Sequence, residues 1–150
     1  MKKIFTMLLM TTLMIAFVSC GASEKKAGVY TYAAKNLSVE MTVFAKDDEV
    51  TKIEQKSELD IKKYSKKKIV PIEASIKEMK KIYKSIDGAK YSVDQGKDMI
   101  TENIEIPVND KTIDKIKKEN LIPVSDPKAK TISLKKFTQS LEKSGWKKKK

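Results

Sequence analysis

The segment Leu37-Ser38-Val39-Glu40-Met41-Thr42-Val43-Phe44 decides the fold class, because apolar side chains alternate along it with mostly polar ones. A period of two places the apolar side chains on one side of an extended chain, which is typical of a strand with one buried face. Segment 29–34 before it is rich in valine, tyrosine and threonine, and segment 50–57 after it resumes with valine and isoleucine among charged neighbours. With the polar turn 46–49 between the last two, these segments predict an antiparallel meander.

A helix and a hairpin are expected next along the chain. Apolar residues recur every three or four positions in the range 72–86, with Pro71 expected in the first turn and Gly88 at the end of the helix. Segments 91–94 and 99–106 are apolar enough for strands and are separated by a short polar turn. They predict a hairpin.

Two further helices are predicted in the last third of the chain. A short one is expected to be capped by the Asn-Asp pair at 109–110, and a longer one extends from near Ser133 and ends at Gly145. If Gly145 adopts the left-handed conformation, Trp146 lies where a hydrophobic contact back to Leu141 accompanies a Schellman cap. We therefore expect the lone tryptophan to pack against the domain and not to serve as a stacking platform for sugars.

The order of these elements predicts an α+β fold, since strands come in runs of three and two that are separated and followed by helices. We expect an antiparallel β-sheet of about five or six strands with about three helices packed mainly on one face. Residues 28–146 have a length that suits a single domain. Residues 147–150 then form a basic tail beyond it.

The N-terminal segment indicates export. Two lysines precede an apolar run at 4–18, which is shorter than the roughly 20 residues of a transmembrane helix but suits a secretory signal. The string Val18-Ser19-Cys20-Gly21 resembles a bacterial lipobox. We expect residues 1–19 to be a lipoprotein signal peptide and Cys20 to be the site of lipid attachment. Ordinary secretion with cleavage elsewhere and an uncleaved anchor are the alternatives.

Cys20 is the single cysteine of the chain. An unpaired thiol in an exported protein needs an explanation, and a thioether bond to a diacylglycerol supplies one. Two acyl chains anchor a protein stably, whereas one chain binds a membrane only marginally. Residues 20–27 would then be a short, flexible, lipid-anchored tether, and the protein would be held on the extracytoplasmic face of the cell membrane.

The charged residues restrict the chemistry that the chain can perform. Its net charge is +12, all 32 basic residues are lysines, and it contains no histidine. The lack of histidine excludes serine–histidine and cysteine–histidine relays, and a single cysteine excludes a thiolate zinc site. Without arginine there is no bidentate fork for a carboxylate or phosphate. We expect no catalytic residues, no cofactor and no metal site.

Runs of lysine at 62–63, 66–68 and 147–150 are the candidate binding residues. Export makes nucleic acid an unexpected partner, so anionic lipid headgroups or cell-wall polymers are nearer candidates. The residues expected to contact such a surface are Lys147, Lys148, Lys149 and Lys150. The alternative explanation is the codon usage of an AT-rich genome, which favours lysine.

Two groups of carboxylates resemble functional sites in composition only. The string Asp47-Asp48-Glu49 lacks the spaced ligands and the glycine of a calcium-binding loop, so we expect it to be a solvated hairpin turn. Glu102 and Glu105 lie in one predicted strand three positions apart, which points their side chains to opposite faces. They are therefore not expected to act as a catalytic pair.

Three parts of the sequence resemble the YehR-like small bacterial lipoproteins, a family without an established biochemical function. The resemblance is carried by Ser38–Val43 through Glu49–Lys52, by Ile86–Ser92, and by the strings Ile132–Lys136 and Leu141–Trp146. It implies an antiparallel α+β fold and a location in the cell envelope, and it implies no active-site residue. The sequence departs from the family pattern at Trp146, where a smaller aromatic residue is usual, and in its lysine tail.

Two functions from different classes fit these observations. The first is an exported, membrane-anchored lipoprotein whose domain is a non-enzymatic module that binds an envelope protein, anionic lipid or cell-wall polymer. The alternative is a small enzyme or transporter accessory lipoprotein that uses a lysine or carboxylate site. A binding patch on an open sheet face would favour the first, whereas a deep pocket around a lysine or carboxylate with a shifted pKa would favour the second.

Overall fold

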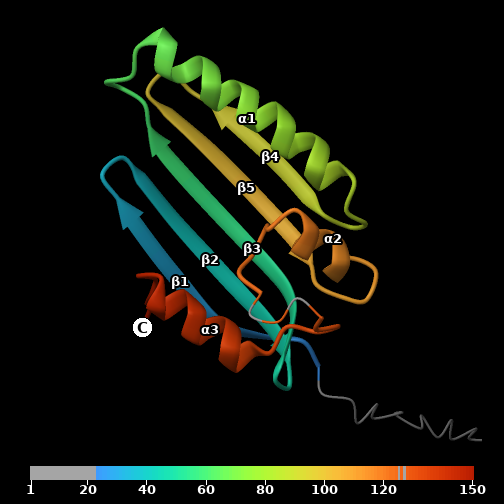
Figure 1. Cartoon of the computed structure of the whole chain (residues 1–150). Coiled ribbons are helices and arrows are strands. Elements are labelled where there is room, and N and C mark those ends of the chain that lie inside the picture. The colour runs from blue at the N-terminus through green and yellow to red at the C-terminus, as the bar shows by residue number, and fades with distance from the viewer. Residues whose placement is uncertain (1–22, 125, 127) are drawn as a thin grey trace, which may run out of the picture.

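An antiparallel sheet of six strands organises the computed structural model, which describes residues 23–124, 126 and 128–150 (Figure 1). The strand order across the sheet is β4-β5-β3-β2-β1-β6. The strands are β1 (Lys25–Ala34), β2 (Leu37–Lys46), β3 (Glu49–Asp60), β4 (Lys90–Gln95), β5 (Met99–Pro107) and β6 (Lys147–Lys148). The helices are α1 (Lys66–Lys84), α2 (Ile113–Lys118) and α3 (Leu134–Lys143). The expected signal peptide and Cys20 lie outside the described residues.

The two central strands, β2 and β3, carry the alternation that the sequence predicts. Val39, Met41 and Val43 are buried, while the intervening Ser38 and Glu40 are exposed. Antiparallel pairing sets Val43 opposite Ile53, and Ile53 opposite Ile106 of β5. Directly opposite residues share one face of a sheet, so this register assembles an apolar row across three strands.

The core joins this apolar row to all three helices. Figure 1 shows α1 lying along β4 and α3 beside β1 and β2, with α2 near the end of β5. The buried side chains of the helices are Tyr83, Ile113, Ile116, Phe137 and Leu141, and all of them belong to the same cluster as the buried strand residues. The prediction of an antiparallel sheet combined with a few helices, roughly an α+β fold, is confirmed.

The start of α1 differs from the prediction. Pro71 was expected in the first turn, but α1 begins at Lys66 and encloses Pro71. A proline inside a helix removes the N–H that would bond to the carbonyl four residues earlier, here that of Lys67. Both residues are exposed, so water can bond to that carbonyl and the helix tolerates the proline. The run of lysines before the proline therefore belongs to the helix.

Both ends of the domain extend farther than predicted. Residues 25–27, expected in the tether, are the beginning of β1. Lys147 and Lys148, expected in a tail, form β6 and pair with Thr31 and Tyr30 of β1. The pairing continues beyond β6, since the backbone N–H of Lys149 donates to the carbonyl of Val29 at 2.8 Å. These residues bond to the backbone N–H and C=O groups that the edge of β1 would otherwise leave unpaired.

The end of α3 is the predicted Schellman cap. The backbone N–H of Trp146 donates to the carbonyl of Leu141 at 3.0 Å, and that of Gly145 donates to the carbonyl of Glu142 at 3.1 Å. Gly145 has a φ of +89°, in the left-handed region that favours glycine. The ring of Trp146 packs against the core and lies 5.6 Å from that of Tyr32 between centroids. The tryptophan is thus a packing residue that helps to attach α3 to β1.

Replacing the glycine of this cap tests its conformational role. Gly145→Ala is expected to lower the free energy of unfolding by about 1–2 kcal/mol, because a Cβ atom is disfavoured in the left-handed region. The added atom would lie 3.8 Å from the nearest atom of Tyr32, an ordinary contact, so a clash does not account for the loss. Urea denaturation measures the change. Gln139→Ala, an exposed change on the same helix, should stay within about 0.5 kcal/mol of wild type, and an equal loss in both variants would contradict the account.

Candidate functional site

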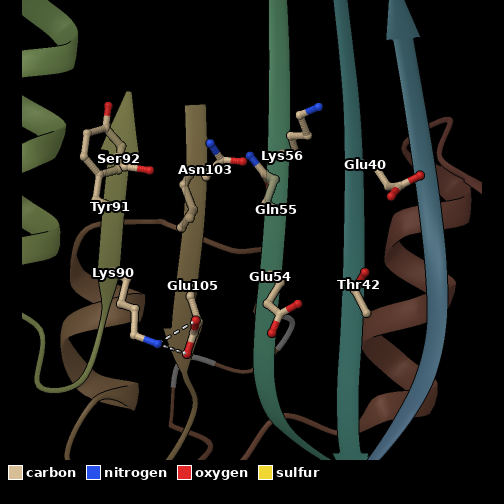
Figure 2. Close-up of a pocket in the computed structure, with 11 residues that line it drawn as sticks. Glu40, Thr42, Glu54, Gln55, Lys56, Lys90, Tyr91, Ser92, Asn103 and Glu105 are labelled. Carbon is tan, nitrogen blue, oxygen red and sulfur yellow. Dashed lines mark hydrogen bonds and ion pairs between the residues drawn. The ribbon is translucent and has the colours of Figure 1, made fainter. Parts of the chain in front are cut away.

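The sheet carries two rows of mostly polar side chains on the side opposite its buried apolar row, and we call this side the open face. Register places these residues together, because directly opposite partners share a face. The first row crosses β2, β3, β5 and β4 as Thr42, Glu54, Glu105 and Lys90. The second row follows the same order as Glu40, Lys56, Asn103 and Ser92. Figure 2 shows these side chains standing side by side on four neighbouring strands.

A depression of about 520 Å³ lies over these rows. The eight residues of the two rows line it, and Gln55, Tyr91 and Ile104 also border it, although strand alternation points their side chains to the other face. Its walls offer hydroxyl, amide, carboxylate and ammonium groups, so it suits hydrogen bonding to a polar ligand more than the enclosure of an apolar one.

The carboxylates of the open face are each held by a lysine. Lys90 Nζ lies 3.0 Å from Glu105 Oε2 (Figure 2), Lys52 Nζ lies 2.8 Å from Glu54 Oε1, and Lys149 Nζ lies 2.9 Å from Glu40 Oε2. Such solvent-accessible pairs contribute little to stability. Lys90 and Glu105 join neighbouring strands, whereas Lys52 and Glu54 both belong to β3.

The pKa shifts on this face stabilise the charged forms. The hydrogen bond from Lys149 lowers the pKa of Glu40, and the hydrogen bond to Glu54 raises the pKa of Lys52. The hydrogen bond to Glu58 likewise raises the pKa of Lys56. A lysine that acts as a nucleophile or general base needs the opposite shift, toward a neutral amine. The shifts therefore suit electrostatic and hydrogen-bonding contacts.

The other side of the sheet holds a tyrosine–carboxylate contact beneath α1. The hydroxyl of Tyr91 donates to Glu102 Oε1 at 2.6 Å, and the rings of Tyr91 and Tyr83 stack with centroids 5.0 Å apart. Burial, followed by the charge of Glu102, raises the pKa of Tyr83 to about 12, and burial also raises the pKa of Tyr91. Glu105 instead pairs with Lys90 on the open face, which confirms that the two glutamates point to opposite faces.

The acidic turn between β2 and β3 attaches α3 to the sheet. The hydroxyl of Ser133 donates to Asp48 Oδ2 at 2.8 Å, and the backbone N–H of Lys135 donates to Asp48 Oδ1 at 3.1 Å. These two bonds lower the pKa of Asp48. The turn thus has a structural contact that the prediction of a solvated turn did not include. Within the described residues, no three His, Cys, Asp or Glu side chains come close enough to hold a metal ion.

The candidate lysines lie in two different places. Lys147 to Lys150 follow the edge of β1, where Lys149 is paired with Glu40. The runs at 62–63 and 66–68 lie in the connection between β3 and α1 and in the first residues of α1. In the part of the chain that the structure describes, no helix is both long and apolar enough to cross a bilayer.

The sequence alone did not predict that these polar residues align into two rows on the open face. The alternation in β2 identifies Glu40 and Thr42 as outward-facing, but their neighbours on β5 and β4 are more than 45 residues away in the chain. Which polar residues align depends on the pairing of β3 with β5, and this pairing is not encoded in any local motif.

Comparisons with known proteins agree with this fold. A family model described as a protein of unknown function (DUF1307) matches residues 26–147. The NMR structure of the E. coli YehR protein is similar, with a TM-score of 0.62 and 17% sequence identity over 84% of this chain and 92% of that chain. At that identity the likeness concerns the fold alone. The search of curated proteins finds no match. The resemblance to the YehR-like family is confirmed.

The tyrosine pair gives a prediction at high pH. The pKa of Tyr83 is raised from an ordinary value near 10 to about 12, so the folded state retains a proton that the unfolded state has lost. Its contribution to stability is complete below about pH 10 and is lost as the pH rises toward about 12. Over that range the free energy of unfolding of wild type should therefore fall relative to that of Tyr83→Phe, which has no hydroxyl to titrate at this position. The ultraviolet absorbance of tyrosinate should also show one late-ionising group fewer in the variant, and identical titrations would contradict the assignment.

Proposed function

The chain belongs to the DUF1307 family of proteins of unknown function, and from this premise we propose that it is an exported, membrane-anchored lipoprotein whose domain is a non-enzymatic binding module of the cell envelope. The observation that carries the binding role is the polar depression on the open face. The lipobox-like string at Cys20 supports the anchor. The partner would be a wall polymer or an envelope protein with polar groups at matching spacing.

The short distance between Cys20 and the fold supports a location close to the membrane. β1 begins at Lys25, so only four residues lie between the proposed lipid site at Cys20 and the sheet, a distance of five residue steps. Even fully extended, this segment spans only about 17 Å. The beginning of β1 would therefore stay near the bilayer surface, and the sheet would extend away from that point.

The division of the sheet into two faces supports the open face as the contact surface. The buried side chains of the helices gather with Val43, Ile53 and Ile106 in one cluster. We infer that the helices pack mainly over this side and leave the open face uncovered. A sheet face with aligned hydroxyl, amide and charged groups can form many hydrogen bonds to an extended ligand, while its paired charges penalise apolar partners.

The pKa shifts favour binding over the alternative of a small enzyme or transporter accessory that uses a lysine or carboxylate. The resolved shifts of lysines, at Lys52 and Lys56, are upward, and those of carboxylates, at Glu40, Asp48 and Asp114, are downward. All five shifts keep these groups charged at neutral pH. A general acid or base requires a pKa that moves toward the working pH.

The lipid anchor is tested by Cys20→Ala. We expect this variant to lose the diacylglycerol mass from its N-terminal peptide and to move from the membrane fraction to the soluble fraction, because the lipid chains provide the membrane affinity. Mass spectrometry and cell fractionation give the two readouts. Ser23→Ala is the matched control and should keep both properties. An unlipidated Cys20 in the wild-type protein would overturn the proposed anchor.

The open face is tested by a photoreactive side chain in place of Thr42. In intact cells this probe should form covalent adducts with an envelope component, because Thr42 lies within the depression. The control places the same probe at Lys80, which is exposed on α1. Gel mobility and mass spectrometry compare the adducts. The same adducts from both positions, or none from Thr42, would count against the open face as the contact surface.

A further inference from the structure

Seven lysines gather at the end of the sheet that lies farthest from the start of β1. They come from the turn between β1 and β2, the connection from β3 to α1, the first residues of α1, and the turn between β4 and β5, all at one end of the molecule (Figure 1). We call them the distal lysine cluster: Lys35, Lys62, Lys63, Lys66, Lys67, Lys68 and Lys97.

Backbone hydrogen bonds hold the contributing segments together. The N–H of Asp60 donates to the carbonyl of Asn36 at 2.8 Å, and the N–H of Ile61 donates to the carbonyl of Asp98 at 2.9 Å. Ile61 is buried, so it fixes the chain at the point where β3 leaves the sheet. The cluster therefore rests on three connected segments, and its lysines project from a fixed base.

The cluster is rich in unneutralised positive charge. All seven lysines are exposed, and within the described residues none of their ammonium groups lies within 4.0 Å of a carboxylate. The segments that contribute the cluster, with the residues next to them in the chain, contain fewer acids: Asp60, Asp94 and Asp98. The Asp60 carboxylate already accepts a bond from the backbone N–H of Lys62 at 3.0 Å. Lys68 Nζ lies over the ring of Tyr64, 5.6 Å from its centroid, and this cation–π contact does not neutralise its charge.

Three of the lysines occupy an electrostatically unfavourable position. Lys66, Lys67 and Lys68 lie in the first turn of α1, which contains no acidic residue, and the side chain of Ser65 makes no capping bond. The N-terminal end of a helix carries partial positive charge, so lysines there repel it and one another. Local rules that are broken without a stabilising gain are characteristic of functional positions.

The cluster lies far from the proposed anchor. β1 has ten residues and rises about 3.3 Å per residue, so Lys35, the first residue beyond its far end, is about 33 Å from Lys25 at its start. Electrostatic attraction in physiological salt extends only about 8 Å. When β1 starts at the bilayer surface and the sheet extends outward, the cluster lies beyond the reach of the charge on that membrane.

We propose that the distal lysine cluster binds a flexible phosphate-rich polymer outside the membrane. The location of the cluster in the envelope rests on the proposed function, whereas the affinity of the cluster for the polymer does not. Lysine ammonium groups act as point charges and lack the fork with which arginine grips a single phosphate in one geometry. A set of such charges suits a chain of repeated phosphates, which can pair with several of them at once and release its counterions.

Inorganic polyphosphate is the probe, and the full-length protein in neutral detergent micelles is titrated with it by calorimetry. The test variant is Lys62→Gln/Lys63→Gln/Lys66→Gln. Each lysine near an anionic surface is worth about 1 kcal/mol, so the triple change should weaken binding by about 100-fold. Raising the salt concentration should lower the polyphosphate affinity of the wild-type protein more steeply than that of the variant.

The matched control is Lys77→Gln/Lys80→Gln/Lys84→Gln, which removes the same charge from exposed positions farther along α1. It should change the affinity by less than about threefold. Loss of repulsion at the helix start should leave the test variant at least as stable to heat as the control, so misfolding cannot account for lost binding.

If polyphosphate binding were weakened equally in both variants, the cluster would not be a specific site, because the loss would then follow from the lower net charge alone. A second arm uses vesicles of phosphatidylglycerol: if the test variant loses affinity for vesicles but not for polyphosphate, the cluster is a lipid contact and the proposal fails. Because none of these assays needs a lipid on Cys20, their failure is distinct from a failure of the anchor or of the open face.

Discussion

The pairing of β2 with β3 is the constraint on which the rest of the structure depends. This pair sets Val43 opposite Ile53 and extends the apolar row to Ile106. Because side chains alternate along a strand, a slip of one residue would turn Glu40 and Thr42 toward the helices and expose the valines and methionine. One register therefore establishes the buried row that receives the helices and the polar rows of the open face.

The features predictable from sequence are those with a local cause. The period of two in residues 37–44 identifies β2, and Gly145 followed by Trp146 identifies a Schellman cap whose two hydrogen bonds are present. The start of α1 was missed because Pro71 is a common first-turn residue, and nothing local shows that the preceding lysines are helical. β6 was missed because it exists only where the free edge of β1 meets the C-terminal lysines.

The candidate site depends even more on distant parts of the chain. Outward-facing residues of β2 can be recognised from the alternation, but the row that joins Thr42 to Lys90 requires the non-local pairings of four strands. The distal lysine cluster has the same origin, since Lys35 and Lys97 lie in turns far from the runs at 62–68. Sequence reasoning finds the charged residues, and the topology decides which of them meet.

These features place the proposed contacts of the lipoprotein in a definite order along the molecule, from the membrane outward. The tether would hold the start of β1 near the membrane, the open face would present hydrogen-bonding groups along the sheet, and the lysine cluster would lie at the far end. In this arrangement the three proposed contacts do not compete for the same surface. Their separation follows from the direction in which β1 leaves the tether and from the antiparallel return of each following strand.

The central claim is that one register leaves the open face free for an envelope partner. NMR relaxation caused by a soluble paramagnetic agent measures it most directly, first on the protein alone and then with solubilised envelope material. The account predicts strong relaxation at Thr42, Ser92 and Asn103, weak relaxation at Val43 and Ile53, and selective protection of the first group when the envelope material is added. Equal relaxation of both groups, or protection confined to the helices, would contradict it.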